Sequence, residues 1–145
     1  MVLERNVAIV RRVYVDVYNA GKVEAIDHLY APNFVSHPNA VSHDGIYGIT
    51  GIKEFVVMLR TAIPDIHFDI LDELATGDKV VTRWRMHGTM LGPLFGFQPT
   101  AKLGSTTGIT IHRVAEGRVV EAWEEADMLG AFDRFGIIPT TTEDI

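Results

Sequence analysis

The hydrophobic period of the chain changes after Pro64, and this change constrains the fold more than any other feature of the sequence. Before it, apolar residues recur at the spacing of amphipathic helices; after it, apolar and polar residues alternate, as they do along half-buried strands. Four such segments follow, spanning residues 66–75, 79–88, 105–114 and 118–126. Two connections, TGD at 76–78 and AEG at 115–117, are short enough for hairpin turns. Helices followed by an antiparallel meander predict an α+β fold, with the helices against one face of a curved sheet.

Three helices are expected in the first half of the chain and a short one near its end. The patterns predict helices at 5–20, 23–30, 50–61 and 128–135, and a short strand at 34–37. Thr50 can cap the third helix and Asp127 the last, because both side chains accept hydrogen bonds from free backbone N–H groups. The Gly- and Pro-rich stretch MLGPLFGFQPTAK predicts a long loop or lip. A single domain is expected over 1–140, with 141–145 as a frayed tail.

Composition argues against several classes of protein. The chain has no cysteine, so it has neither disulfides nor thiolate metal sites. Its six histidines lack close ligand spacing, so no metal centre is expected. A net charge of −6 with scattered basic residues argues against a nucleic-acid partner. No apolar run approaches the roughly 18 residues that cross a membrane, and no signal peptide is visible, so a cytoplasmic protein without a membrane partner is expected.

The acidic cluster EAWEEAD at 121–127 divides when its side chains are assigned to the two faces of the last strand. Because side chains alternate along a strand, Glu121 and Glu125 share one face. Glu124 is then the only carboxylate on the opposite face, whose other members are Val120, Ala122 and Ala126. A carboxylate among small apolar residues is a candidate for a pocket wall.

The expected register of the second hairpin brings further residues to this pocket wall. If the hairpin closes over 115–117, Gly108 lies opposite Glu124. Thr110 is then diagonal to Glu124, and His112 lies on the same inner face. The missing side chain at Gly108 and the nearby hydroxyl predict open space beside the carboxylate.

The first hairpin can be assigned in the same way. Closure over 76–78 predicts an inner face that carries Phe68, Ile70, Trp84 and Met86. The outer face then places Asp69 near Arg85 and His67 near His87. Cross-strand ion pairs are expected there among Arg83, Arg85 and Asp69, and this outer face is a candidate dimer surface.

The sequence resembles the SnoaL-like polyketide cyclases of the nuclear-transport-factor-two-like superfamily. The resemblance is carried by VYNAG, NFVSHP, AIPDIHFDI, GDKVVTRWRMHGTMLGPLFGFQPTAK and RVAEGRVVEAWEEADMLG. It implies a cystatin-like α+β cone, in which a curved antiparallel sheet and three to four helices enclose a hydrophobic cavity. It also implies a polyketide or ester cyclase that works by intramolecular aldol condensation, or an isomerase, with no metal or cofactor.

In such enzymes one carboxylate on the last long strand shuttles the proton, and the resemblance places that role on Glu124, where the family has aspartate. The family's glutamine and histidine on the preceding strand fall on Gly108 and Thr110. A tyrosine near the end of the first helix lines the cavity, and Tyr18 matches it. The loop PLFGFQP resembles the family's loop over the cavity mouth.

Two further residues match the family and have two interpretations each. His37 matches a histidine after the second helix and can face the pocket, or it is only a local hydrogen-bonding group. Asp127 matches an aspartate after the strand, or it is only the cap of the final helix. With Glu124 they are the candidate catalytic residues. The expected pocket-lining residues, which can equally be plain core, are Tyr14, Tyr18, Phe34, Trp84, Phe95, Thr110 and His112.

Acid/base chemistry requires that Glu124 be buried, because a solvated glutamate with a pKa of about 4.3 is a weak base toward carbon acids. The expected partners are a small hydrophobic carbonyl compound and a second copy of the chain in a homodimer. Two alternatives stay open. One is a dimer that binds a small hydrophobic ligand without chemistry. The other is a hydrolase of the limonene-epoxide type, which needs an Asp-Arg-Asp constellation around a water, with Arg83 or Arg85 as the arginine.

Overall fold

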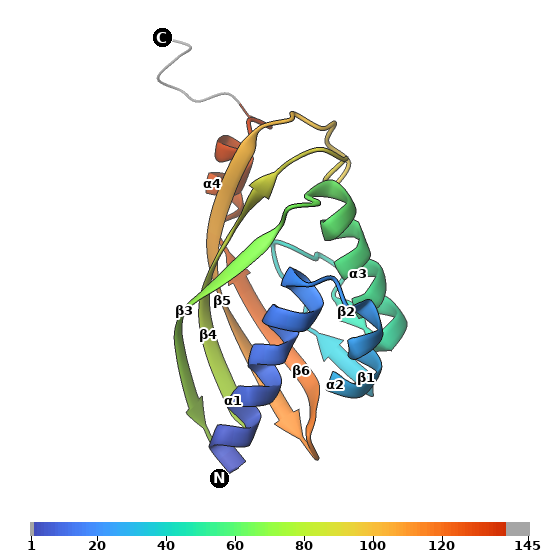
Figure 1. Cartoon of the computed structure of the whole chain (residues 1–145), viewed down its shortest axis with the longest axis vertical. Helices are drawn as coiled ribbons and strands as arrows, with labels where there is room; N and C mark the ends of the chain where they lie inside the picture. Colours follow the sequence, from blue (N-terminus) through green and yellow to red (C-terminus); the bar gives the residue numbers. More distant parts are fainter. Residues whose placement is uncertain (1, 139–145) are drawn as a thin grey trace.

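The computed structural model describes residues 2–138, so the predicted domain end at 140 and the predicted tail at 141–145 lie outside the described residues. Helices cover one face of a curved, unclosed sheet of six strands, which confirms the predicted α+β cone (Figure 1). The strands are β1 (Tyr30–Ser36), β2 (Ile46–Tyr47), β3 (His67–Thr76), β4 (Lys79–Thr89), β5 (Leu103–Ala115) and β6 (Arg118–Ala126). Their order is β2-β1-β6-β5-β4-β3, and every pair is antiparallel except β1 with β6.

The helices form where the apolar spacing predicted them, with shifted ends. The first begins as α1 (Val2–Arg12) and continues as a π-helical stretch, Val13–Asn19. A 3-10 turn at Val23–Ala25 leads into α2 (Ile26–Leu29). The remaining helices are α3 (Gly48–Ala62) and α4 (Met128–Arg134). The α4 helix lies at the end of the molecule remote from the N-terminus (Figure 1).

The two predicted helix caps have opposite outcomes. The Asp127 carboxylate accepts a hydrogen bond from the backbone N–H of Gly130 at 2.8 Å, which confirms it as the cap of α4. The prediction for Thr50 is wrong, because α3 begins at Gly48 and its N-cap residue, Tyr47, makes no side-chain cap. Gly48 has a φ of +71°, a left-handed conformation that glycine adopts without the strain other residues would incur.

The helices bury their apolar faces against the sheet in two clusters. One joins Tyr14 to Trp84 on β4 and to Phe135 just after α4. The other joins α2, α3 and β6 through Ile26, Val56 and Val119. Apolar burial contributes roughly 25 cal/mol for each Å² removed from water, so both clusters stabilise the packing of the helices on the sheet.

Both long hairpins close with two-residue turns rather than the three-residue connections that were predicted. In β3–β4, Thr76 pairs with Lys79, and a bulge between Ile70 and Asp72 then shifts the register back by one. The predicted pairs Asp69–Arg85 and His67–His87 are therefore confirmed. The predicted inner face is confirmed as well, since Phe68, Trp84 and Met86 are buried.

In β5–β6 the two-residue turn and the bulge each move the pairing by one residue from the predicted register, and both move it in the same direction. Ala115 pairs with Arg118, and the register shifts again between Arg113 and Val114. As a result Thr110 lies directly opposite Glu124, and the predicted pairing of Gly108 with Glu124 is wrong. The two single-residue shifts add to two, so the face carrying Glu124 still points inward. Near the bulge, Val119 rather than Val120 takes the buried position.

Candidate functional site

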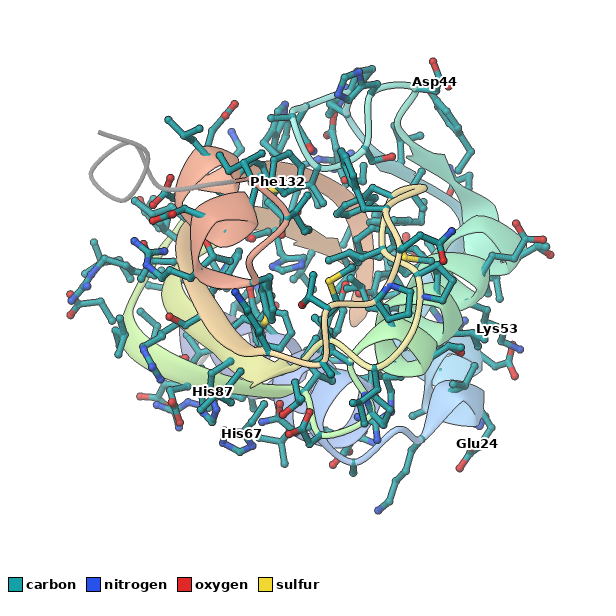
Figure 2. The ribbon with its side chains drawn as sticks, turned by 90° about the horizontal axis from the view of Figure 1, so that it is seen from above. Glu24, Asp44, Lys53, His67, His87 and Phe132 are labelled. Carbon is teal, nitrogen blue, oxygen red and sulfur yellow. The ribbon has the colours of Figure 1, made fainter. Side chains whose placement is uncertain are left out.

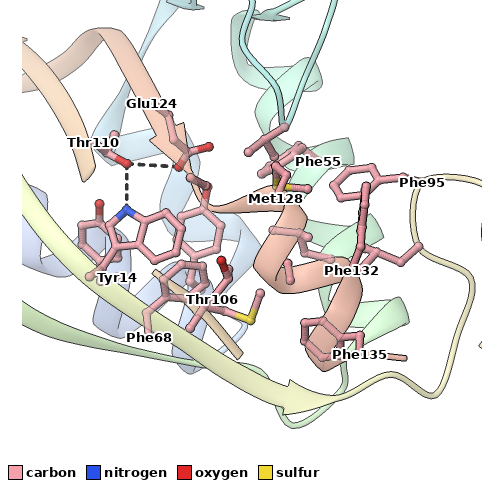
Figure 3. A pocket seen from close by; sticks show the side chains of 18 of the residues that line it. Tyr14, Phe55, Phe68, Phe95, Thr106, Thr110, Glu124, Met128, Phe132 and Phe135 are labelled. Carbon is pink, nitrogen blue, oxygen red and sulfur yellow. Dashed lines mark hydrogen bonds between the residues drawn. The ribbon is translucent and has the colours of Figure 1, made fainter. Parts of the chain in front are cut away.

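A cavity lies between the inner face of the sheet and the helices, beneath the loop at 90–102 (Figure 3). The space between its walls measures ≈ 670 Å³, counted out to the solvent at its mouth. Most of its wall is aromatic or aliphatic, and this wall includes Phe55, Phe68, Met86, Leu94, Phe95, Met128, Phe132 and Phe135. A second, smaller chamber of ≈ 300 Å³, measured in the same way, adjoins it. Apolar walls with few polar groups are typical of sites for small hydrophobic molecules.

Glu124 lies at the junction of the two chambers and is the only carboxylate among their described lining residues. Its Oε1 accepts a hydrogen bond from the Thr110 hydroxyl at 3.0 Å. Part of the side chain is accessible from the cavity, but protein surrounds the carboxylate densely. Burial therefore raises the pKa of Glu124, and the neighbouring charge of Glu125 adds to this, while the bond from Thr110 acts in the opposite direction.

Thr110 is itself oriented by Trp84, whose indole Nε1–H donates to the Thr110 hydroxyl oxygen at 2.9 Å (Figure 3). The hydroxyl accepts from the indole, so its own proton is directed toward Glu124. Gly108, directly opposite Trp84, makes this arrangement possible. A Cβ at Gly108 would lie 2.4 Å from Cζ2 of Trp84, so no larger residue fits without moving the indole. The space predicted beside Gly108 is thus filled by Trp84.

His112 lies on the same face of β5 as Thr110 and lines both chambers. His112 is only 5% exposed, and this burial lowers the pKa of its imidazole to about 4. The ring meets Tyr14 edge-on, with centroids 6.0 Å apart. Its Nδ1 is buried and finds no hydrogen-bond partner among residues 2–138. Such orphaned buried groups are uncommon in native proteins, so this nitrogen requires an explanation.

The seven predicted pocket residues all line the cavity. Tyr14, Tyr18, Trp84, Phe95, Thr110 and His112 line the larger chamber, and Phe34 lines the smaller one. Burial raises the pKa of Tyr14 and of Tyr18, so both phenols stay protonated at neutral pH. Phe95 comes from the loop over the mouth and has a φ of 49°.

His37 and Asp127, the other two candidate catalytic residues, are placed elsewhere. The Nε2 of His37 lies 2.5 Å from Oε2 of Glu121, and its ring stacks on Trp123 with centroids 5.2 Å apart. Glu121 and Trp123 belong to the outer face of β6, so His37 does not face the pocket. Asp127 is half-exposed at the start of α4 and does not line either chamber.

Sequence reasoning missed part of the lining. Phe132 and Phe135 repeat at helical spacing within the predicted final helix, so their burial could have been inferred from the pattern. Tyr30 and Ser36 of the smaller chamber come from β1, which begins four residues earlier than predicted. The sequence pattern around β1 does not indicate that this strand pairs in parallel with β6.

The charged residues of the first hairpin lie on the outer face, where His67 and His87 project away from the cavity (Figure 2). Arg85 pairs with Asp69 at 3.8 Å, as predicted, whereas Arg83 pairs with Asp72 at 3.0 Å. Within the described residues, no three His, Asp or Glu side chains gather closely enough to hold a metal ion. None of the helices described there is both long and apolar enough to cross a membrane.

The model of the SnoaL-like polyketide cyclase family matches residues 8–134. The chain is similar to a proposed SnoaL-like polyketide cyclase from Jannaschia sp. CCS1, with 23% identity, coverage of 95% of this chain and 96% of that one, and a TM-score of 0.85. It is also similar to a proposed polyketide cyclase from Acidithiobacillus ferrooxidans, with 29% identity, coverage of 93% and 96%, and a TM-score of 0.82. A third, the proposed polyketide cyclase IdmH from Streptomyces antibioticus, has 25% identity, coverage of 90% and 98%, and a TM-score of 0.78. No curated protein matches the sequence.

Proposed function

Because the chain belongs to the SnoaL-like polyketide cyclase family, we propose that it is a cofactor-independent acid/base enzyme, a cyclase or an isomerase. Its substrate is a small hydrophobic carbonyl compound, and Glu124 is the group that moves the proton. The observation that carries this proposal is a carboxylate of raised pKa in the wall of an apolar cavity. A general acid/base works best when its pKa lies near the operating pH, and burial moves Glu124 in that direction.

In the cyclase form, the Glu124 carboxylate removes a proton from the carbon next to a substrate carbonyl, which leaves an enolate. The enolate carbon attacks a second carbonyl carbon of the same molecule, and a carbon–carbon bond closes the ring. The resulting alkoxide takes the proton back from Glu124, so the carboxylate is regenerated and no co-reactant is consumed. Proton transfer of this kind contributes roughly 10²–10⁴ to the rate, and folding the substrate within the apolar walls can contribute more.

A titration of Glu124 by NMR tests the proposal. The midpoint should lie well above about 4.3. Glu121, on the outer face of the same strand, is the matched control, because hydrogen bonds from His37 and Arg113 lower its pKa. A midpoint for Glu124 at the ordinary value would refute the acid/base role.

Proton abstraction can be measured with phenylacetone, a simple aryl ketone, by following exchange of its α-hydrogens for deuterium. The exchange should be lost in Glu124→Gln and retained in Glu121→Gln, with both variants folded. Exchange that persists in Glu124→Gln would contradict the assignment of the base.

A second candidate function is ligand binding without chemistry. It is favoured by the single side-chain hydrogen bond that Glu124 accepts within residues 2–138, from Thr110, where the family has a histidine. This candidate predicts hydrophobic ligand binding with no α-hydrogen exchange in the wild type. The epoxide-hydrolase alternative has less support, because no arginine is among the described residues that line either chamber.

We also propose a homodimer formed through the outer face of the sheet. That face carries the stacked pair His37 and Trp123, and Ile109, which is 46% exposed. Mass measurements over a dilution series should give twice the chain mass of 16.1 kDa at high concentration. Ile109→Asp should weaken association, because it places a charge among residues that would be buried.

A further inference from the structure

The two chambers differ in chemistry although they share a wall. Glu124, Thr110, His112, Tyr18 and Phe55 line both. Beyond this shared wall, the larger chamber is almost entirely aromatic and aliphatic. The smaller one adds two residues with hydroxyl groups, Tyr30 and Ser36, which are 1% and 7% exposed. Tyr14 and Thr106 also bring hydroxyl groups to the larger chamber, but most of its wall is apolar, so the smaller chamber is the more polar of the two in proportion.

His112 is one of the polar side chains that line both chambers. Its Nδ1 is buried and makes no hydrogen bond to any described residue. Because burial lowers its pKa to about 4, the imidazole is neutral at neutral pH. A neutral imidazole offers one N–H donor and one acceptor nitrogen, so it can serve either a carbonyl or a hydroxyl oxygen.

The charge of the lining limits what the smaller chamber can accept. No lysine or arginine is among the described residues that line either chamber, and Glu124 is the one acidic group. A carboxylate or phosphate placed beside His112 would be buried without a cation, which is strongly unfavourable. A neutral oxygen meets no such penalty.

We propose that the smaller chamber is a subsite for a neutral hydroxyl or carbonyl oxygen of the ligand, and that His112 is its hydrogen-bond partner. The subsite rests on the proposed function, because it places the oxygenated end of the same ligand whose carbon meets Glu124. The apolar body of the ligand occupies the larger chamber, between Phe68 and Phe132. The ligand is thus an uncharged molecule that is apolar at one end and oxygenated at the other.

A matched pair of small probes tests the subsite. Acetophenone and α-methylstyrene have the same shape, but a CH₂ group replaces the carbonyl oxygen in the second. NMR titration of the wild type should show acetophenone binding about tenfold more tightly, the effect of one buried hydrogen bond. In His112→Leu the preference should be lost or reversed, because the carbonyl oxygen would be buried without its partner. The control His67→Gln, on the outer face, should keep the preference.

Each outcome of this experiment is informative. Equal binding of the two probes to the wild type, failure of both to bind, or a preference that survives in His112→Leu would overturn the subsite. If His112→Leu does not fold, the imidazole ¹⁵N shifts of His112 in the wild type replace it. They should move on addition of acetophenone and stay constant with α-methylstyrene.

The subsite and the proposed chemistry can fail separately. Glu124→Gln keeps the cavity shape, so the preference for acetophenone should persist in that variant although α-hydrogen exchange is lost. An ordinary titration of Glu124 together with a retained probe preference would refute the acid/base role and leave the subsite standing. If the wild type exchanges α-hydrogens but binds the two probes equally, the subsite is refuted and the acid/base role stands.

Discussion

The burial of His112 predicts a specific dependence of stability on pH. Its pKa is about 4 in the folded chain, against 6.5 for an ordinary histidine. Between these values the unfolded chain binds a proton that the folded chain does not, so stability rises with pH across this window. The difference corresponds to about 3 kcal/mol, which accumulates at about 1.4 kcal/mol for each pH unit. Below the folded pKa both states are protonated, and the dependence from this residue ends.

Urea unfolding monitored by tryptophan fluorescence measures the effect. The Glu124→Gln background is used, because Glu124 titrates in the same cavity with the opposite sign. Its folded pKa is raised, so it lowers stability as pH rises. In that background, adding His112→Leu should remove about 3 kcal/mol of the rise in stability between pH 4 and 6.5.

Two results would refute this reasoning. One is a pH dependence that is the same with and without His112→Leu. The other is an NMR titration of the His112 ring with a midpoint at the ordinary 6.5, which would mean that the imidazole is protonated as easily as in solvent.

Three further changes have expected outcomes. Thr110→Val should raise the pKa of Glu124 further in an NMR titration, because it removes a hydrogen bond to the charged form; an unchanged titration would contradict the contact. Gly108→Ala should destabilise the fold by about 1–3 kcal/mol in urea, because its Cβ would meet Trp84. Asp127→Ala should cost about 1 kcal/mol by loss of the cap, and a shifted Glu124 titration in this variant would argue against a purely structural role.

The alternation of residues was enough to predict the elements and the inner faces of the sheet. It could not predict the registers, because each depends on a turn length and a bulge that leave no local pattern. In β3–β4 the two shifts cancel, so Asp69 meets Arg85 as predicted. In β5–β6 they add, so Thr110 replaces Gly108 as the partner of Glu124. The face of Glu124 follows from the alternation within β6, and a register shift of two residues keeps Glu124 on the same side as Thr110 and His112.

The sequence left two interpretations of His37 open for a different reason. It follows β1, and the pattern around it does not distinguish an inward from an outward side chain. The pairing of β1 with β6, which puts Val35 beside Glu121, settles the question in favour of the outer face. Parallel neighbours that lie far apart in sequence are set by tertiary packing. A histidine next to such a strand therefore cannot be assigned to a cavity from its own segment.

Gly108 and Thr110 stand where the family has glutamine and histidine. Whether Glu124 can still act as a base depends on the hydrogen bonds that its carboxylate accepts. A buried carboxylate that accepts several hydrogen bonds has its pKa driven far below neutrality and is a poor base, whereas one with none would simply remain protonated. A single bond from Thr110, held in direction by Trp84, lies between these extremes. It orients the carboxylate while leaving burial as the larger influence on its pKa. Gly108 and Thr110 are therefore compatible with a working base, because together they allow one neutral donor to do the orienting.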